Sequence, residues 1–215
     1  MESRTTAAAL CAPVAIPRTA LFGGTFDPIH NGHLEIARAA ADRFDLERVI
    51  FVPAANPPHK QGGPAASFED RVCMATLACA DEPRFDVSCI EEGAGPSYSI
   101  DTVERLRALG YGPLAFLIGA DAFREIRTWH RWRDLVAAVE FIVVTRPGAA
   151  WSMPEGAVVH ELPGLDLPVS SSAIRARVAE GAAGLPVPPV VAGYIQRRGL
   201  YVHSQNKFPE TADST

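Results

Sequence analysis

The sequence lacks any apolar run that could cross a membrane. Its longest hydrophobic stretches, residues 114–120 and 141–145, are of strand length, whereas a membrane-spanning helix needs about 20 residues. It also lacks an excess of positive charge, because 20 basic residues stand against 25 acidic ones and the formal net charge is −5. A general nucleic-acid binder normally carries a basic stripe. We therefore expect a cytoplasmic protein that binds neither membranes nor nucleic acid.

Cysteine is scarce, and several familiar motifs are missing. The four cysteines form no C-x-x-C pair, so we expect small, buried, reduced side chains rather than disulfides or a zinc site. No P-loop and no His-Glu-x-x-His helix occurs, which excludes the NTPases and metalloproteases that carry those motifs. The composition is otherwise ordinary, with 47% hydrophobic and 21% charged residues. A folded domain with one sizeable core is expected.

The hydrophobic pattern predicts an α/β fold. Short segments that are apolar on both faces alternate with helical segments from residue 20 to residue 145, which is typical of a parallel sheet covered by helices on both sides. We expect a Rossmann-like, doubly wound, mainly parallel sheet with a small C-terminal helical portion. The predicted strands are residues 20–22, 49–52, 85–90, 114–118 and 141–145, with a weaker edge strand at 158–162.

One domain is expected, over residues 19–202. Residues 1–18 are predicted to be a flexible N-terminal extension and residues 203–215 a loose C-terminal tail. Right-handed crossovers place the carboxyl ends of parallel strands at one edge of the sheet. Unusual segments at Gly23, Pro53, Gly119 and Arg146 each follow a predicted strand. We therefore expect ligands to bind at that edge.

The most informative segment is GGTFDPIHNGH, residues 23–33. Gly23 and Gly24, directly after a strand, let a ligand approach the backbone closely. His30 and His33 lie three residues apart at the start of a helix, so they project onto one face of its first turn. The free N–H groups and the positive end of the helix dipole point the same way. The segment predicts an anion-binding site, whereas an isolated His-x-x-His could equally be an ordinary helix start.

A second segment, VSSSAIR at residues 169–175, has similar chemistry. Consecutive serines at a helix start offer an N-cap, hydroxyl donors and open amides, and Arg175 adds a fixed charge one turn later. A serine-rich helix start alone is usually only a cap. Together with the histidine segment it predicts a second phosphate cradle.

These two segments resemble the GxFDPxHxGH and ISSTxIR signatures of the HxGH nucleotidyltransferases. Further segments occur in the order typical of one family among them, the bacterial nicotinate-nucleotide adenylyltransferases: residues 52–60, 97–102, 118–121, Trp129, 146–148, 187–188, 194–195 and 200–201. The resemblance covers residues 19–202. Ser99 and Ser172 stand where the family often has threonine, and His130 where a tyrosine is common.

The resemblance implies transfer of the adenylyl group of ATP to nicotinate mononucleotide, giving nicotinate adenine dinucleotide (deamido-NAD) and pyrophosphate in NAD biosynthesis. It implies that His30, His33 and Arg175 are catalytic. The implied ATP site comprises Gly23, Gly24, Thr25, Phe26, His30, His33, Gly119, Asp121, Ser171, Ser172 and Arg175. The implied mononucleotide site comprises Asn56, Lys60, Tyr98, Ser99, Thr102 and Trp129. Mg²⁺ would be carried with ATP, and no metal site on the protein is expected.

Plainer alternatives remain open at the level of sequence. Trp129 could fill a hydrophobic gap, Asp121 could cap a short helix, and Lys60 could be a solvated loop charge. The acceptor could instead be nicotinamide mononucleotide or phosphopantetheine. A non-catalytic nucleotide sensor on the same fold is a further alternative, because fold does not fix function. A homo-oligomer is compatible with the sequence.

Overall fold

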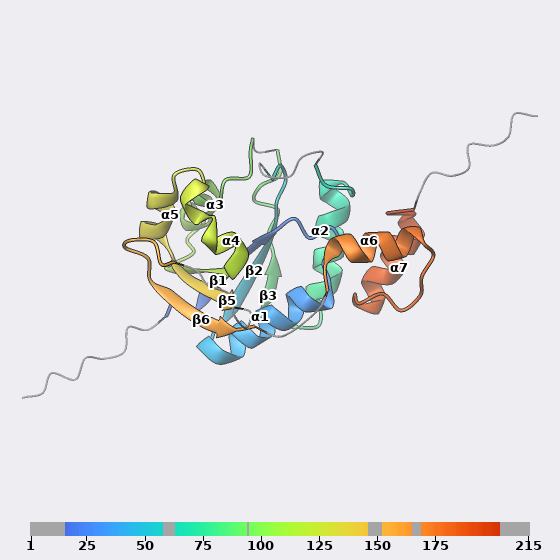
Figure 1. The fold of residues 1–215 in the computed structure, drawn as a ribbon, viewed down its shortest axis with the longest axis horizontal. Coiled ribbons are helices and arrows are strands. Elements are labelled where there is room, and N and C mark those ends of the chain that lie inside the picture. Colours follow the sequence, from blue (N-terminus) through green and yellow to red (C-terminus); the bar gives the residue numbers. More distant parts are fainter. Residues whose placement is uncertain (1–15, 58–62, 94, 146–151, 165–168, 203–215) are drawn as a thin grey trace, which may run out of the picture.

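The computed structural model describes residues 16–57, 63–93, 95–145, 152–164 and 169–202 (Figure 1). In this part of the chain six strands form one sheet in the order β3-β2-β1-β4-β5-β6, and every pairing is parallel. The strands are β1 (Thr19–Gly24), β2 (Arg48–Pro53), β3 (Phe85–Val87), β4 (Leu114–Gly119), β5 (Glu140–Thr145) and β6 (Val159–Pro163). The Rossmann-like parallel sheet predicted from the sequence is confirmed.

Helices cover both faces of the sheet. One layer consists of α1 (Asn31–Phe44) and α2 (Phe68–Cys79), beside which pack the C-terminal helices α6 (Ser171–Ala179) and α7 (Pro189–Arg198) (Figure 1). The other layer consists of α3 (Ser99–Ala108), α4 (Ala120–Arg124), the short 3₁₀ helix η1 (Ile126–Thr128) and α5 (Trp132–Ala138). None of the helices described is both long and apolar enough to span a bilayer.

The alternation of side chains along each strand divides the core in two. In β1, Ala20 and Phe22 belong to the cluster under α1 and α2, whereas Leu21 belongs to the cluster under α3 and α5. Successive strand residues point to opposite faces, so a strand covered on both sides must be apolar at every position. This is why the sequence shows continuous hydrophobic runs at β1, β2, β4 and β5.

Two expectations about the β3 region and the cysteines were wrong. The strand predicted at residues 85–90 ends at Val87, because the chain enters a turn in which the N–H of Glu92 donates to the carbonyl of Cys89 at 2.8 Å. Cys79 is buried as expected, but Cys73 and Cys89 are exposed, and all three are free thiols. Cys73 lies on α2, and Cys89 follows the edge strand β3. Cys11 lies outside the described residues.

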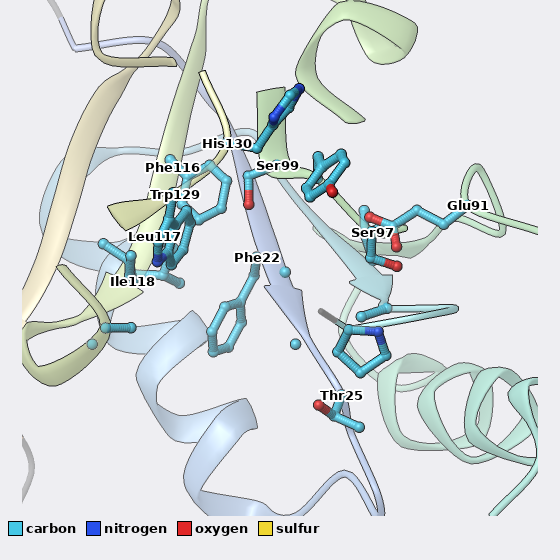
Figure 2. Close-up of a pocket in the computed structure, with 18 residues that line it drawn as sticks. Phe22, Thr25, Glu91, Ser97, Ser99, Phe116, Leu117, Ile118, Trp129 and His130 are labelled. Atoms are coloured by element: carbon cyan, nitrogen blue, oxygen red, sulfur yellow. The ribbon is translucent and has the colours of Figure 1, made fainter. Parts of the chain in front are cut away.

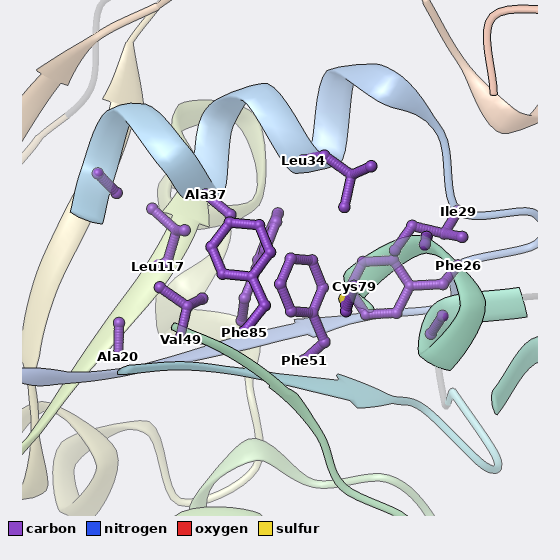
Figure 3. Packing of buried hydrophobic residues seen from close by; sticks show 14 of the residues in the cluster. Ala20, Phe26, Ile29, Leu34, Ala37, Val49, Phe51, Cys79, Phe85 and Leu117 are labelled. Atoms are coloured by element: carbon purple, nitrogen blue, oxygen red, sulfur yellow. The ribbon is translucent and has the colours of Figure 1, made fainter. Parts of the chain in front are cut away.

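An aromatic cluster joins the strands to the loop that follows β1. Phe51 on β2 is fully buried and lies among the side chains that include Phe26 and Phe85 (Figure 3). Its ring centroid lies 5.4 Å from that of Phe22, 5.7 Å from that of Phe26 and 5.1 Å from that of Phe85. Aromatic rings at such separations add to the free energy gained by burying their surface. The cluster therefore anchors Phe26, and with it the loop between β1 and α1, to the sheet.

Phe51→Ala should be strongly destabilising. The substitution leaves a cavity among three rings, and losses of about 3–5 kcal/mol in the free energy of unfolding are typical for such a change. Phe51→Leu, which keeps most of the volume, should cost about 1.5 kcal/mol or less. Urea unfolding followed by circular dichroism measures both, and equal losses for the two variants would contradict this account of the cluster.

Candidate active site

Three cavities meet at the carboxyl end of β1. The tryptophan cavity, about 240 Å³, is lined by Trp129, Tyr98, Ser99, His130 and Glu91 among others (Figure 2). The histidine cavity, about 350 Å³, is lined by residues that include His30, His33, Asp121 and Ser170. The arginine cavity, about 360 Å³, is lined by Thr25, Phe26, Asp27, His33, Ser171, Ser172 and Arg175.

The cavities share lining residues, so they form one connected site. Phe22 and Gly119 line both the tryptophan and the histidine cavity, and Thr25 lines both the tryptophan and the arginine cavity. His33 and Ser171 line both the histidine and the arginine cavity. His33 therefore lies where an extended ligand would pass from one cavity to the next.

His30 and His33 form a stacked pair at the start of α1. Their ring centroids are 3.7 Å apart at an interplanar angle of 17°, and the N–H of His30 donates to Nδ1 of His33 at 3.3 Å. A Cβ added to Gly32 would lie 3.2 Å from Nδ1 of His30. The glycine between the histidines therefore gives the ring of His30 room to stack.

Both imidazoles are neutral at neutral pH. Burial lowers the pKa of His30 to about 4, and burial together with repulsion from His30 holds the pKa of His33 well below its ordinary value. Because Nδ1 of neutral His33 accepts a hydrogen bond, its proton lies on Nε2. His33 thus offers an N–H donor without carrying a full charge.

The loop between β1 and α1 is held by donors from other elements. Arg71 of α2 donates to the carbonyl of Thr25 and Arg175 of α6 to the carbonyl of Asp27, both at 2.7 Å. The hydroxyl of Ser171 donates to the carbonyl of Pro28 at 2.9 Å. Carbonyl oxygens that would repel an anion are therefore bonded within the protein, and the loop has one fixed shape.

The carboxylate of Asp27 reinforces this arrangement. It is 1% exposed and accepts from the backbone N–H groups of Ala65 and Ala66 at 2.8 and 3.1 Å. The hydroxyl of Tyr201 donates to it at 2.8 Å, and Nη1 of Arg175 lies 3.7 Å away. Burial and the neighbouring Asp27 raise the pKa of Tyr201, so the phenol remains a donor.

The wall of the tryptophan cavity combines an aromatic surface with an open helix start. Trp129 is half-buried and meets Phe116 edge-on at 6.2 Å, and its indole lines the cavity (Figure 2). Tyr98 stacks on His130 at 4.2 Å. Tyr98 is also the N-cap of α3, and no side chain caps that helix. Its first-turn N–H groups are a natural site for an anionic group beside a flat ring.

Most of the predicted site residues come together in these cavities. Those that line at least one of them are Gly23, Gly24, Thr25, Phe26, His30, His33, Tyr98, Ser99, Gly119, Asp121, Trp129, Ser171, Ser172 and Arg175. Asp121 also pairs with Arg124 at 2.5 Å, and both side chains are exposed. Lys60 and residues 146–148 lie outside the described residues.

Asn56 and Thr102 are not among the residues that line the cavities. The backbone N–H of Asn56 donates to Oγ of Ser97 at 2.9 Å, and the hydroxyl of Thr102 donates to Glu91 at 2.6 Å. Both residues fix the shape of the cavity wall. Glu91 was not predicted from the sequence, because an acidic residue in a surface turn gives no local signal of burial.

The described residues contain no group of three or more His, Cys, Asp or Glu side chains that could hold a metal ion.

Sequence comparison identifies the family. Residues 21–177 match the profile of the cytidylyltransferase-like family. The chain is 54% identical over 187 residues to a probable nicotinate-nucleotide adenylyltransferase of Solibacter usitatus (strain Ellin6076), covering 86% of this chain and 99% of that protein. The chain belongs to the nicotinate-nucleotide adenylyltransferase family. The resemblance drawn from the sequence motifs is thereby confirmed.

A second relative agrees with this membership, and a solved structure shares the fold. A probable nicotinate-nucleotide adenylyltransferase of Desulfotalea psychrophila (strain LSv54 / DSM 12343) is 40% identical over 210 residues, covering 84% of this chain and 98% of that protein. The Plasmodium falciparum nicotinic acid mononucleotide adenylyltransferase complexed with NaAD has a TM-score of 0.69 at 19% identity, covering 85% of this chain and 96% of that chain. The likeness to the solved structure shows that the two chains have the same fold.

The buried neutral state of His30 should make stability depend on pH. An unfolded histidine binds a proton near pH 6.5, but native His30 does so only near pH 4. Between these values the unfolded state binds more protons, so the contribution of His30 to the free energy of unfolding should fall by about 2 kcal/mol from pH 7 to pH 5, and His33 should add a change of the same sign.

His30→Asn should remove this contribution, whereas His130→Asn should keep it because it leaves His30 in place. Urea unfolding of the wild type and both variants at the two pH values is the measurement. The same pH dependence in wild type and His30→Asn would contradict the assignment.

Proposed function

We propose that this enzyme transfers the adenylyl group of ATP to nicotinate mononucleotide, releasing pyrophosphate and forming nicotinate adenine dinucleotide for NAD biosynthesis. The observation that carries the proposal is the meeting of three cavities at His33, Thr25 and Phe22. The tryptophan cavity offers a flat aromatic wall and an open helix start. The histidine and arginine cavities offer histidines, serines and an arginine. Membership in the adenylyltransferase family supports the same reaction.

The chemistry is a direct displacement at phosphorus. A phosphate oxygen of the mononucleotide attacks the α-phosphorus of ATP, and the bond from that phosphorus to the bridging oxygen of the pyrophosphate breaks. No side chain needs to act as a nucleophile, so the rate depends on positioning and on stabilising the charge that develops on the phosphoryl oxygens.

His33 is proposed to donate from Nε2 to an oxygen of the α-phosphate, because it lines both the histidine and the arginine cavity. His30 supports it from the adjacent stacked ring. Arg175, Ser171 and Ser172 line the arginine cavity, where we place the departing pyrophosphate. Nη1 of Arg175 already bonds the carbonyl of Asp27, so its other N–H groups would serve the ligand.

The acceptor is proposed to occupy the tryptophan cavity. Its pyridine ring would stack on Trp129, and its carboxylate would bind the N–H groups at the start of α3, near Tyr98 and Ser99. Donors arranged for a carboxylate would be left partly unpaired by the amide of nicotinamide mononucleotide, which favours the nicotinate form. Lys60 is proposed to contact the mononucleotide phosphate.

ATP is proposed to bind with its adenosine in the histidine cavity, where Asp121 and Gly119 line the wall and Asp121 would accept from the ribose hydroxyls. We propose that Mg²⁺ enters on the phosphates of ATP and helps to neutralise their charge, as is common for this ion. The cytoplasmic location and the homo-oligomer expected from the sequence stay predictions.

The test of the reaction is pyrophosphate release in the presence of ATP and Mg²⁺, with nicotinate mononucleotide, nicotinamide mononucleotide and phosphopantetheine offered separately. The nicotinate form should give by far the highest kcat/KM. Preference for another acceptor would contradict the assignment of the acceptor, and binding of ATP without turnover of any acceptor would favour a sensor.

His33→Ala should lower kcat by roughly 10²–10³-fold, because it removes a donor aimed at the developing charge. The variant should remain folded, which circular dichroism checks, because His33 lines two cavities and is not part of either hydrophobic core cluster. A folded His33→Ala enzyme with wild-type kcat would contradict the role of this histidine.

Trp129→Ala should raise the KM for the mononucleotide by roughly 10–100-fold, as expected for the loss of a base-stacking surface. The KM for ATP should change little, because Trp129 lines only the tryptophan cavity among the three that form the site. Trp132→Ala is the matched control, since Trp132 lines none of the three. Equal effects of Trp129→Ala on both substrates would mean that Trp129 only fills the core.

A further inference from the structure

Glu91 is a buried carboxylate at the cavity proposed for the acceptor. It is 6% exposed and lies in the turn between β3 and α3. It lines the tryptophan cavity on the side opposite Trp129 (Figure 2). Buried carboxylates need partners, because burying an unpaired charge is costly.

Both oxygens of Glu91 accept hydrogen bonds from different walls of the cavity. Oε2 accepts from the backbone N–H of Ala55, in the loop after β2, at 3.2 Å. Oε1 accepts from the hydroxyl of Thr102, in the first turns of α3, at 2.6 Å. One side chain thus bridges two segments that are 36 and 11 residues away from it along the chain.

A second bridge joins the same two walls nearer to solvent. The N–H of Asn56 donates to Oγ of Ser97, and the N–H of Ser97 donates to the carbonyl of Asn56, both at 2.9 Å. The Asn56–Ser97 side-chain bond is exposed, whereas the Thr102–Glu91 bond is buried. Hydrogen bonds shielded from water are electrostatically stronger, so Glu91 should be the firmer of the two bridges.

We propose that Glu91 is a positioning residue that fixes the distance between the loop after β2 and the start of α3, and thereby the width of the acceptor cavity. This inference rests on the proposed function, because it assigns the cavity to the mononucleotide. Glu91 does not bind the acceptor in this account: both of its oxygens are already bonded, and its charge would repel an anionic ligand.

A variant of Glu91 can separate the effect of its hydrogen bonds from the effect of its charge, because Thr102 has a second acceptor nearby. The hydroxyl of Thr102 also lies 3.3 Å from the carbonyl of Tyr98. In Glu91→Gln, the amide oxygen can accept from the N–H of Ala55 while the amide nitrogen donates to the hydroxyl of Thr102, which then donates to Tyr98. Glutamine can therefore keep the bridge without the charge, whereas alanine removes it.

The test compares the steady-state kinetics of Glu91→Ala and Glu91→Gln with those of the wild type. Glu91→Ala should raise the KM for nicotinate mononucleotide by about tenfold or more, as expected for the loss of a buried two-ended hydrogen bond, and leave the KM for ATP within about twofold. Glu91→Gln should restore the KM for the mononucleotide to within about threefold of the wild type. Glu92→Ala, which removes the adjacent exposed carboxylate, is the matched control and should change neither KM.

A selective rise in the acceptor KM that glutamine rescues supports the proposal. It is overturned by an unchanged acceptor KM in folded Glu91→Ala, by equal rises for both substrates, or by a Glu91→Gln enzyme as impaired as Glu91→Ala. Should Glu91→Ala not fold, Thr102→Val removes one end of the bridge and Thr102→Ser retains it. Thr102→Val should then raise the KM for the mononucleotide but not the KM for ATP, and Thr102→Ser should raise neither. An unchanged KM for the mononucleotide in Thr102→Val overturns the proposal.

The wild-type acceptor panel separates this result from the proposed function. If the wild type uses a different acceptor, the assignment of nicotinate mononucleotide fails, and the same variants are measured with the acceptor that is used. If the wild type turns over nicotinate mononucleotide and the acceptor KM does not respond to Glu91, only the role of Glu91 fails.

Discussion

The carboxylate of Asp27 joins parts of the chain that lie far apart in sequence. It accepts from the backbone at Ala65 and Ala66 and from the phenol of Tyr201, which lies 174 residues away, and it stands beside Arg175. The loop between β1 and α1 is thereby fixed to the segment just before α2, to α6 and to the segment after α7. Since His30 and His33 follow this loop directly, their placement depends on the same network.

The electrostatic design of the site favours an anion without a permanently charged histidine. The two imidazoles stack at 3.7 Å, and burial keeps both neutral in the free protein. Two imidazolium rings at that distance would repel each other, so neutrality is what allows the stacking. The fixed positive charge comes instead from Arg175 and from helix N-termini, which need no change of protonation when a ligand enters.

The sequence predicted those features that depend on short-range patterns. The parallel sheet follows from apolar runs and their alternation with helices, and the meeting of His30 and His33 at one cavity follows from their spacing. The features that it missed depend on contacts between distant segments. The burial of Glu91 arises only when the loop at Ala55 and helix α3 meet above β3. The same contact shows that the hydroxyl of Thr102 holds Glu91, and the contact between Thr102 and the mononucleotide that the motif implies stays a prediction.

The hydrogen bond from Tyr201 to Asp27 also has a consequence for biosynthesis of the protein. A chain is made from its N-terminus, so the histidine segment leaves the ribosome long before Tyr201 does. Until then the loop lacks one of the donors to Asp27, and Arg175 arrives only shortly before. All six strands of the described sheet have been synthesised once the chain reaches Pro163, whereas the loop between β1 and α1 can reach the geometry described here only after Tyr201 has been added.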